Sequence, residues 1–382
     1  MPILPQARLG ELLTIKKNTV NFSFWPMGKT TRRFGVQTVL YASEPWSVIR
    51  QSINDKCPSA DRPATHAFLT QSQEFFEAAT SGKTDCAKPL LLYYSFLNLV
   101  KAYLLTFTTR THGDFDGARH GISEKLPTGG SEIIDAHLEC YPSPTSSGKL
   151  NIFDEFYTSV MGKSIATITD YKVPHLLPQI LPGHRLWADS QNERQRFFRL
   201  SRIELMQNRT SKEIWLRLYV REGDLTHWKI AHVNLLSEAN FSSTFKEVQS
   251  NAMLGSDHLL CFEQDVPLSY SHRAADKVSD LVEQHRNDLW VTATTIAPYR
   301  AYYLYMSPAS EASCRLPQLL SIYAIMFYLG SVTRYRPHQF ISILEGKYAS
   351  QIYGILTSQP RQFLYLMASN FARQEVATQA LI

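Results

Sequence analysis

The sequence contains few cysteines and has a small net charge, and each of these features argues against a class of protein. The five cysteines among 382 residues are isolated and odd in number, which argues against a disulfide framework and against a thiolate metal site. The 39 lysines and arginines barely exceed the 34 aspartates and glutamates, a surplus too small to require nucleic acid as a partner. The cysteine usage fits a reducing cytoplasm best.

Signatures of several common enzyme classes are missing as well. The sequence contains no G-x-x-x-x-G-K-S/T, no G-x-G-x-x-G, no H-E-x-x-H, no C-x-x-C and no G-x-S-x-G. Their absence removes most of the support for common nucleotide hydrolases, dehydrogenases, zinc proteases and serine hydrolases. We therefore expect neither a cofactor nor a metal.

Long apolar runs are few, and none predicts a membrane span. The N-terminus lacks the apolar run of a signal peptide. Two stretches, 89–107 and 316–332, approach membrane-spanning length, but the first contains Asn98 and Lys101 and the second is short and is followed by two arginines. We expect both to be buried helices of a globular, cytoplasmic protein that has no membrane partner.

Hydrophobic residues make up 44% of the chain and charged residues 19%, so the chain can bury a large core. The strongest predicted element is KPLLLYYSFLNLVKAYLLTF, a helix over 88–107 with Pro89 in its first turn and Thr84 or Asp85 as its cap. Amphipathic spacing predicts another helix over 64–80. Helices are also expected over 151–162, 275–290, 316–335, 337–355 and 359–380, the last three separated by prolines.

The middle of the chain contains the predicted strands. Apolar and polar residues alternate over 214–221, and Glu222-Gly223-Asp224 predicts a turn into a second strand around Ile230, which together form a hairpin. Residues 196–202 are expected to form a neighbouring strand. The predicted fold is mainly α with a smaller antiparallel β insertion, an α+β protein in which N- and C-terminal helices form one helical bundle.

These elements predict a division of the chain into four parts. They are an N-terminal arm over 1–60, the first part of the helical core over 61–140, a strand-containing insertion over 141–270 and the second part of the helical core over 271–382.

One side of the helix over 88–107 is polar. Lys88, Tyr94, Ser95, Asn98 and Lys101 lie on one arc of less than half its circumference. Burying lysine or asparagine without hydrogen bonds is unfavourable, so each group should meet a carboxylate, a carbonyl, water or a ligand. We expect Lys88, Tyr94, Asn98 and Lys101 to line a ligand pocket. For the lysines, snorkelling or a salt bridge is the alternative.

Three blocks of sequence resemble the signature blocks of the YaaC-like family. They are KPLLLYYSFLNLVKAYLL, HGIS at 120–123 and MFYLGSVTRYRP at 326–337, and they occur in the family's order. The resemblance implies the helical frame of the fold and a cytosolic bacterial context. It supplies no catalytic residue.

His120 and Gly121 lie in a glycine-rich loop, RTHGDFDGARHGISEKLPTGG, where little regular structure is expected. Histidine titrates near neutrality and glycine permits close approach, so His120 is a candidate acid, base or phosphate contact, and Gly121 a candidate ligand-binding residue. A surface or capping histidine is the alternative. Nearby, His112, Asp114 and Asp116 have the donor types for a divalent metal, but D-x-D in such a loop is more typical of turns.

Arg334 and Arg336 end the apolar stretch just before Pro337. Guanidinium groups bind phosphate or carboxylate in a bidentate manner, so this pair is a candidate anion clamp. The alternative is that both arginines only complement the negative end of the helix dipole.

The segment 185–221 contains nine basic residues against four acidic ones, interleaved with aromatic residues. This mixture is typical of surfaces that bind single-stranded nucleic acid. The alternative is a solvated sheet face whose arginines pair with carboxylates.

A looser resemblance points to the HEPN nucleases, helical proteins in which arginine and histidine activate the ribose 2′-hydroxyl for RNA cleavage. The long helix, the histidine loop and the C-terminal arginine are similar to that architecture. The R-x-x-x-x-x-H spacing occurs only from Arg221 to His227, where a turn is expected, so we interpret that match as chance.

The sequence thus leaves two functional hypotheses. In the first, a polar pocket formed by the residues of the long helix, His120 and Arg334 binds a nucleotide or RNA. If the protein is an enzyme, it is a metal-independent, RNase-like phosphodiesterase and an effector of bacterial defence, with His120 as acid or base and Arg334 or Lys88 stabilising charge. In the second, a non-catalytic scaffold protein binds a protein partner through the middle β segment. The oligomeric state stays open.

Overall fold

The structure is a computed structural model, and it describes residues 4–15, 17–25, 39–82, 85–126, 133–227, 230–292 and 301–378. The chain divides into two compact units, each built from distant parts of the sequence. Unit 1 comprises residues 1–41, 194–310 and 373–382, and unit 2 comprises residues 42–193 and 311–372.

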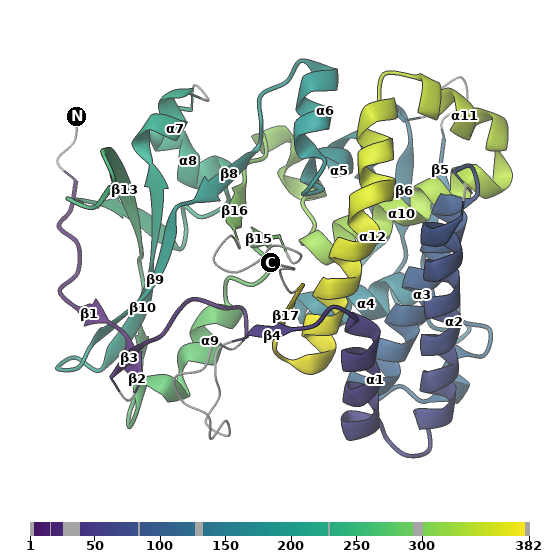
Figure 1. Cartoon of the computed structure of the whole chain (residues 1–382), viewed down its shortest axis with the longest axis horizontal. Helices are drawn as coiled ribbons and strands as arrows, with labels where there is room; N and C mark the ends of the chain where they lie inside the picture. The colour runs from purple at the N-terminus through teal and green to yellow at the C-terminus, as the bar shows by residue number, and fades with distance from the viewer. Residues whose placement is uncertain are drawn as a thin grey trace. The chain divides into compact units, whose positions relative to one another are not determined.

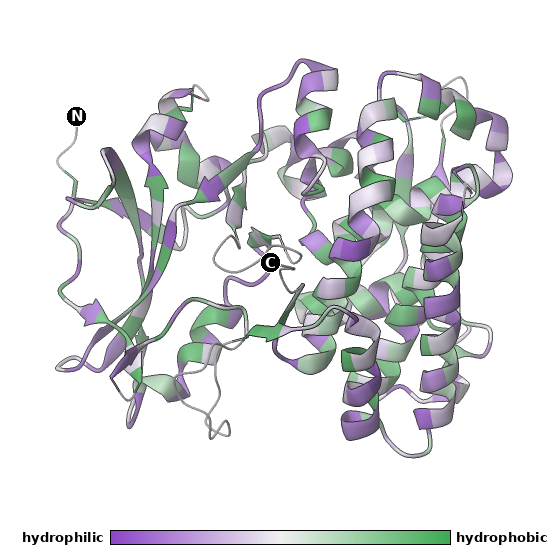
Figure 2. Cartoon of the chain, in the orientation of Figure 1, coloured by the Kyte–Doolittle hydropathy of each residue, from purple (hydrophilic) through white to green (hydrophobic). Residues whose placement is uncertain are grey.

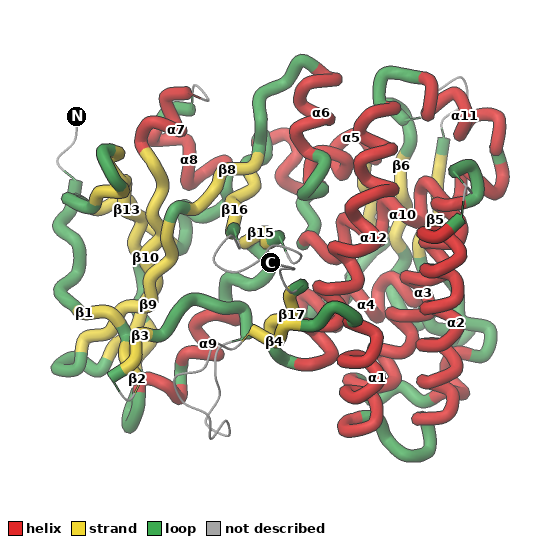
Figure 3. The backbone as a smooth tube through the Cα atoms, viewed as in Figure 1, coloured by secondary structure: helices red, strands yellow, loops and turns green. Residues whose placement is uncertain are grey.

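Six helices form most of unit 2 (Figures 1 and 3). They are α1 (Pro45–Lys56), α2 (Arg62–Ser81), α3 (Lys88–Phe107), α10 (Gln318–Tyr335), α11 (Pro337–Glu345) and α12 (Ala349–Ala372). The buried helix α3 packs against both α2 and α10, and α1 packs against α12. In Figure 2, α1 and α2 show hydrophilic and hydrophobic residues in alternation, as amphipathic helices do.

The two helices predicted near the N-terminus are confirmed. Helix α2 ends at Gly82 as expected, and α3 has the predicted bounds. The predicted cap of α3 is wrong, because Ala87 occupies that position and no side chain caps the helix. Pro89 lies in the first turn, where its missing N–H costs no hydrogen bond.

Helix α3 also has the length and apolar composition of a membrane span, and it is the one such helix in the described part of the chain. In the structure, 72% of its most apolar window is buried. The core helix of a globular protein meets the same criterion, so its composition alone is weak evidence for a membrane.

Aromatic contacts hold the core of unit 2 together. The rings of Phe96 in α3 and Phe363 in α12 stack with centroids 3.9 Å apart, and Phe371 packs edge-on against Tyr103 at 5.3 Å. These contacts explain a correction: α12 continues through Pro360, where the sequence predicts a break. Buried residues on both sides of Pro360 stabilise the helix enough to offset the backbone hydrogen bond that proline removes.

A small antiparallel sheet completes unit 2. Its strands are β5 (Ile122–Lys125), β6 (His137–Cys140) and β7 (Thr169–Lys172), accompanied by the helices α4 (Ile152–Met161), α5 (Val173–Leu176) and α6 (His184–Gln191). Helix α4 confirms the prediction for 151–162. The glycine-rich loop is more regular than expected, because it contains a 3-10 turn at His112–Phe115 and then strand β5. Gly129 and Gly130 lie outside the described residues.

Unit 1 is mainly antiparallel sheet. Its larger sheet has the order β1 (Glu11–Leu12), β9 (Arg202–Asn208), β10 (Glu213–Arg221), β13 (Asp257–Gln264) and β11 (Phe245–Val248), with β12 (Met253–Leu254) and β14 (Leu268–Ser269) at its margins. A second sheet has the order β15 (Leu289–Val291), β16 (Tyr302–Tyr305) and β8 (Phe197–Leu200). The remaining strands are the short pair β2 (Thr14–Ile15) and β3 (Asn18–Thr19) and the parallel pair β4 (Val39–Tyr41) and β17 (Glu375–Ala377).

The strand predicted over 214–221 is confirmed as β10, but the hairpin after it is wrong. The chain instead forms α7 (Glu222–His227) and then α8 (His232–Glu238), while β10 pairs with β9 and β13. Acidic residues in the first turn favour a helix there, and Leu225 is fully buried. The segment predicted as one strand over 196–202 is divided between β8 and β9, which belong to different sheets.

The helix predicted over 275–290 is also wrong, because the range holds only the end of a 3-10 helix (Ala274–Asp276) and the short α9 (Val278–Glu283) before the chain enters β15. Trp290 is completely buried in that strand, and such a large residue fits a sheet packed on both faces. With its several small antiparallel sheets and its helices, the protein is α+β.

The two units divide the chain at different residues from those predicted. Residues 42–60, expected in an N-terminal arm, contain α1 of unit 2, and residues 141–193, expected with the strands, also belong to unit 2. The strand-rich part of unit 1 extends from 194 to 310. In both units, segments that are far apart in the sequence pack together. Amino-acid composition does not indicate which distant segments will pack together, so it could not predict these boundaries.

Candidate functional site

The polar side of α3 faces α2. Ser95 Oγ donates a hydrogen bond of 2.8 Å to the Ser72 carbonyl, and Ser72 Oγ donates one of 2.7 Å to the Ser95 carbonyl. One turn further, Asn98 Nδ2 donates to Gln71 Oε1 at 2.7 Å. Buried polar groups are stable when paired in this way. Ser95 and Asn98 therefore join the two helices.

Lys101 continues the same side of α3 but has a different environment. Its ammonium lies 5.1 Å from the centre of the Phe68 ring, a cation–π contact, and partial burial lowers its pKa. Among the residues that the structure describes, no carboxylate pairs with it. Lys101 is therefore a partly desolvated cation with no counter-ion among the described residues.

The backbone around His120 is fixed to the start of α4. The Ile152 N–H donates to the Arg119 carbonyl and the Phe153 N–H to the His120 carbonyl, both at 3.0 Å. These bonds satisfy two N–H groups that a helix start leaves free. The histidine is therefore held by main-chain contacts rather than carried on a free loop.

Gly121 explains why a glycine follows that histidine. Its φ is +74°, and a Cβ at this position would lie 2.8 Å from the backbone carbon and the Cβ of Asn151. Only glycine accepts both the conformation and the approach. This backbone role accounts for Gly121, which was predicted to bind a ligand.

The imidazole of His120 packs between aromatic rings, and the charges of two cations act on it. Its Nδ1 shares a hydrogen bond of 2.6 Å with the hydroxyl of Tyr93, which is 4% exposed, and its ring centre lies 6.1 Å from that of Phe327. Burial lowers the pKa of His120, and the positive charges of Lys101 and Arg334 lower it further. The charges of two residues on other elements, Lys101 and Arg334, therefore act on His120.

Arg334 and Arg336 differ although they are two residues apart. Arg334 is exposed, and its Nη1 donates a hydrogen bond of 2.9 Å to the hydroxyl of Tyr94. Arg336 forms an ion pair with Glu124, which also accepts a hydrogen bond of 3.2 Å from Ser331 Oγ. Arg336 is thus neutralised within the protein, whereas no carboxylate in the described ranges pairs with Arg334.

Lys88 lies apart from Lys101. The two residues stand thirteen positions apart in α3, which at about 1.5 Å per residue separates their backbones by about 20 Å. The two ammonium groups therefore do not share one small pocket. We define the His120 cluster as His120, Tyr93, Tyr94, Lys101 and Arg334.

Tyr93 was not among the site residues predicted from the sequence. Its hydroxyl holds the histidine, yet in the sequence it is one more aromatic residue in an apolar helix. Because Tyr93 is almost fully buried, only its hydroxyl could have indicated a role, since a buried tyrosine usually has a hydrogen-bond partner.

The residues considered as metal ligands have turn and capping roles instead. Asp114 accepts hydrogen bonds from Thr111 N at 2.7 Å and from Thr111 Oγ1 at 3.0 Å, and Asp61 accepts from His112 N at 2.8 Å. Within the described ranges, no group of three or more histidine, cysteine, aspartate or glutamate residues could hold a metal ion.

The basic residues of the middle segment are mostly paired with acids. The pairs are Arg194 with Glu238, Arg202 with Glu204, Arg209 with Glu11, Arg217 with Glu263 and Arg221 with Asp257. These contacts agree with the alternative of a carboxylate-paired sheet. Arg221 also ends a strand and has its own partner, so its spacing to His227 provides no support for a HEPN-type site.

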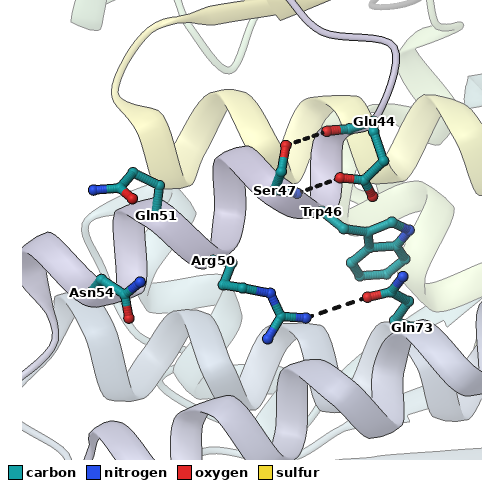
Figure 4. A pocket seen from close by; sticks show the side chains of 7 residues that line it. All are labelled: Glu44, Trp46, Ser47, Arg50, Gln51, Asn54 and Gln73. Carbon is teal, nitrogen blue, oxygen red and sulfur yellow. Dashed lines mark hydrogen bonds between the residues drawn. The ribbon is translucent and has the colours of Figure 1, made fainter.

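A shallow hollow lies between α1 and α2 of unit 2 (Figure 4). It has a volume of about 260 Å³ and is lined by Glu44, Trp46, Ser47, Arg50, Gln51, Asn54 and Gln73. Glu44 accepts the Ser47 N–H at 2.7 Å as a helix cap, and Arg50 lies 3.5 Å from Gln73 Oε1. These are local helix contacts, so the His120 cluster remains the better candidate site.

The comparisons with known proteins agree with the sequence blocks. The model of the YaaC-like protein family matches residues 32–371, which is most of the chain. Neither the comparison with curated proteins nor that with solved structures gave a match. By the extent of that match, the chain belongs to the YaaC-like family.

Proposed function

We propose that the His120 cluster binds an anionic ligand, a nucleotide or an RNA phosphate. The observation that supports this most is that the charges of two cations act on one imidazole, while no carboxylate within the described residues neutralises either cation. Each cation lowers the pKa of His120, which reflects an unbalanced positive potential. A bound phosphate would neutralise that potential, and phosphate is the common partner of such groups.

The three donors suit a phosphate in complementary ways. Lys101 supplies a compact charge, Arg334 supplies a planar fork, and His120 supplies a ring nitrogen. The hydroxyl of Tyr94 already orients the Arg334 guanidinium through their 2.9 Å hydrogen bond. An oriented fork loses less side-chain entropy on binding.

Tyr93 also determines what His120 can do chemically. When the Tyr93 hydroxyl donates to Nδ1, the proton of the neutral ring lies on Nε2, which then donates to a phosphate oxygen. When the hydroxyl accepts from Nδ1, Nε2 carries the lone pair of a general base. The lowered pKa keeps the ring neutral near pH 7, as both roles require.

If the ligand is RNA, cleavage would follow from the same groups. His120 would take the proton of the 2′-hydroxyl as the 2′-oxygen attacks the adjacent phosphorus, and Lys101 or Arg334 would stabilise the charge on the phosphorane. The bond from phosphorus to the 5′-oxygen would then break, the protonated His120 would give its proton to the departing 5′-oxygen, and a 2′,3′-cyclic phosphate would remain. This reaction is metal-independent. Lys101 is the better choice of the two lysines, because its charge acts on His120. We place this activity in the bacterial cytoplasm, as an effector of defence.

The test is a binding and turnover assay of the purified protein against a panel of nucleotides and RNA. Wild type, His120→Ala and Arg334→Ala are compared, with Arg185→Ala as the control because Arg185 is an exposed arginine of the same unit. We expect His120→Ala and Arg334→Ala to lose binding or cleavage while remaining folded, and the control to behave as wild type. If wild type is inert towards the whole panel, the cluster has no anionic ligand of this kind.

The alternative is a non-catalytic scaffold that binds a protein through unit 1. Apolar side chains at its surface favour this reading: Val266 is 73% exposed and Met253 is 51% exposed. This alternative predicts that Met253→Glu abolishes capture of a protein partner while His120→Ala does not. The reverse pattern would contradict it.

A further inference from the structure

Unit 1 contains a cavity of about 340 Å³ that the proposed function does not use. It lies where the end of β13, the start of β11 and the segment after α9 meet. Its walls are formed by Ser243, Thr244, Gln264, Val266, Pro267, Leu268, Gln284 and His285. None of these residues is an acid, a lysine or an arginine, so the cavity offers hydrogen bonds without a fixed charge.

His285 is the unusual member of this wall. Its side chain is 2% exposed, and its ring packs against the rings of Phe241 at 6.1 Å and Phe245 at 5.1 Å. Within the described part of the chain, the buried Nε2 has no hydrogen-bond partner. Burial lowers the pKa of His285 to about 4, so the ring is neutral at pH 7 and has one donor and one acceptor nitrogen. Leaving such groups unpaired is unfavourable.

Two amides stand beside that imidazole. Gln264 is 4% exposed, its Oε1 accepts the Leu216 N–H at 3.1 Å, and its Nε2 lies 3.4 Å from Gln284 Oε1. That last contact is long for a hydrogen bond, so the amide groups have donor capacity left. Val266, Pro267 and Leu268 supply an apolar side to the same cavity.

We infer that this cavity binds a small uncharged molecule whose planar edge carries a hydrogen-bond donor beside an acceptor, as a nucleobase or a primary carboxamide does. The imidazole and the two amides offer complementary donors and acceptors, and the apolar wall covers a flat face. The volume is at the lower end of the range for small-molecule pockets, which excludes large ligands. A charged ligand would find no counter-charge among the lining residues.

The test uses the full-length chain with ¹³C-labelled histidine. The probes are adenine and cytosine as nucleobases, nicotinamide as a carboxamide, and toluene as a flat molecule without hydrogen bonds. The His285 resonance is identified by its loss in His285→Phe, a substitution that keeps an aromatic ring against Phe241 and Phe245. Affinities of wild type, His285→Phe and Gln284→Ala are compared through the resonances of the probe molecule, because the His285→Phe chain lacks the reporter histidine, with His338→Phe, at an exposed histidine of unit 2, as the control.

We expect adenine, cytosine or nicotinamide to shift the His285 resonance in a saturable way, and toluene to leave it unchanged. His285→Phe should weaken binding of the same probe about tenfold and Gln284→Ala by less, because each removes one hydrogen-bonding group. The control should bind as wild type does. Each probe is added up to about 10 mM, which detects affinities down to the weakest that matter here. If no hydrogen-bonding probe gives a saturable shift, the inference is overturned. Binding of toluene alone would also overturn it. Because the cavity is in unit 1 and the His120 cluster is in unit 2, either proposal can fail without the other.

Discussion

The His120 cluster of unit 2 and the arginine-bearing sheet of unit 1 both contain several cations beside aromatic rings, yet their electrostatics differ. In the sheet, Arg217 lies 2.8 Å from the buried Glu263, and neighbouring arginines also have carboxylate partners. In the cluster, Lys101 and Arg334 contact rings and a hydroxyl but no described carboxylate. The number of basic residues alone would favour the sheet as the anion-binding surface. The cluster is favoured instead, because its cations have no described carboxylate partner whereas those of the sheet do.

The largest effect is expected from removing the buried acid that neutralises Arg217 in the sheet. Glu263 is 1% exposed and accepts from Arg217 Nε at 2.8 Å and Trp215 Nε1 at 3.1 Å. Glu263→Gln should therefore destabilise unit 1 by about 3–5 kcal/mol, because it leaves a buried guanidinium without its counter-charge. Denaturant unfolding followed by tryptophan fluorescence measures the change.

The control for that experiment is Glu11→Gln, which removes the carboxylate of an exposed pair with Arg209. An exposed pair contributes little to stability, so this variant should unfold close to wild type. Equal stability of the two variants would mean that the buried pairing in the sheet is not what holds unit 1 together.

A smaller loss is expected when the support of His120 is disturbed. Gly121→Ala places a Cβ against the backbone of Asn151 at a φ of +74°. The backbone conformation alone costs about 1–2 kcal/mol, and the contact adds to it. Unit 2 should be destabilised, and ligand binding at His120 should weaken, in thermal unfolding and in the binding assay.

Gly113→Ala is the matched control, because a Cβ there meets nothing within 4 Å. It lies in the same segment and should leave both stability and binding near wild type. If Gly121→Ala were equally harmless, the fixed position of His120 would not matter for the site.

The smallest effect is a shift in the titration of His120. Lys101→Met removes one of the two positive charges that lower the pKa of His120, so that pKa should rise towards its ordinary value. Histidine resonances followed by NMR across pH 4 to 9, a window that brackets the ordinary value of about 6.5, report the change. Arg185→Met, which removes an exposed charge, should leave the titration unaltered.

The same pKa predicts how the stability of unit 2 depends on pH. Because the pKa of folded His120 lies below its unfolded value of about 6.5, the unfolded chain takes up the proton first as the pH falls. The contribution of this group is therefore fully present above about pH 6.5 and declines towards the folded pKa. Lys101→Met should narrow that window, and an unchanged window would contradict the electrostatic coupling.

Much of the helical part of the fold follows from local sequence. The unbroken apolar run of α3, its early Pro89 and the glycine that ends α2 predict those helices almost to the residue. The polar arc of α3 is also correctly predicted to need partners, which Ser72 and Gln71 supply. Periodicity and chain breakers act within a few residues, so they can be recognised without the tertiary structure.

Other elements depend on contacts that local sequence does not contain. The turn-like Glu222-Gly223-Asp224 begins a helix because the burial of Leu225 decides the outcome, and Pro360 stays inside α12 for the same kind of reason. The prediction of a helix over 275–290 is wrong for the same reason, because Trp290 is buried in a sheet. In each case tertiary burial outweighs a local preference of about 1 kcal/mol, or about 3 kcal/mol for proline.

The sequence by itself determined that His120, Lys101 and Arg334 carry the chemistry to bind an anion, since a side chain's charge and hydrogen-bonding groups are fixed by its identity. Only the tertiary structure decided which cations stay unpaired. Arg336 meets Glu124, Arg217 meets Glu263, and Lys101 meets no described acid. Salt screens electrostatic interactions beyond about 10 Å, so the balance of charge depends on spatial neighbours. In sequence these neighbours are more than two hundred residues away for Arg336 and nearly fifty for Arg217.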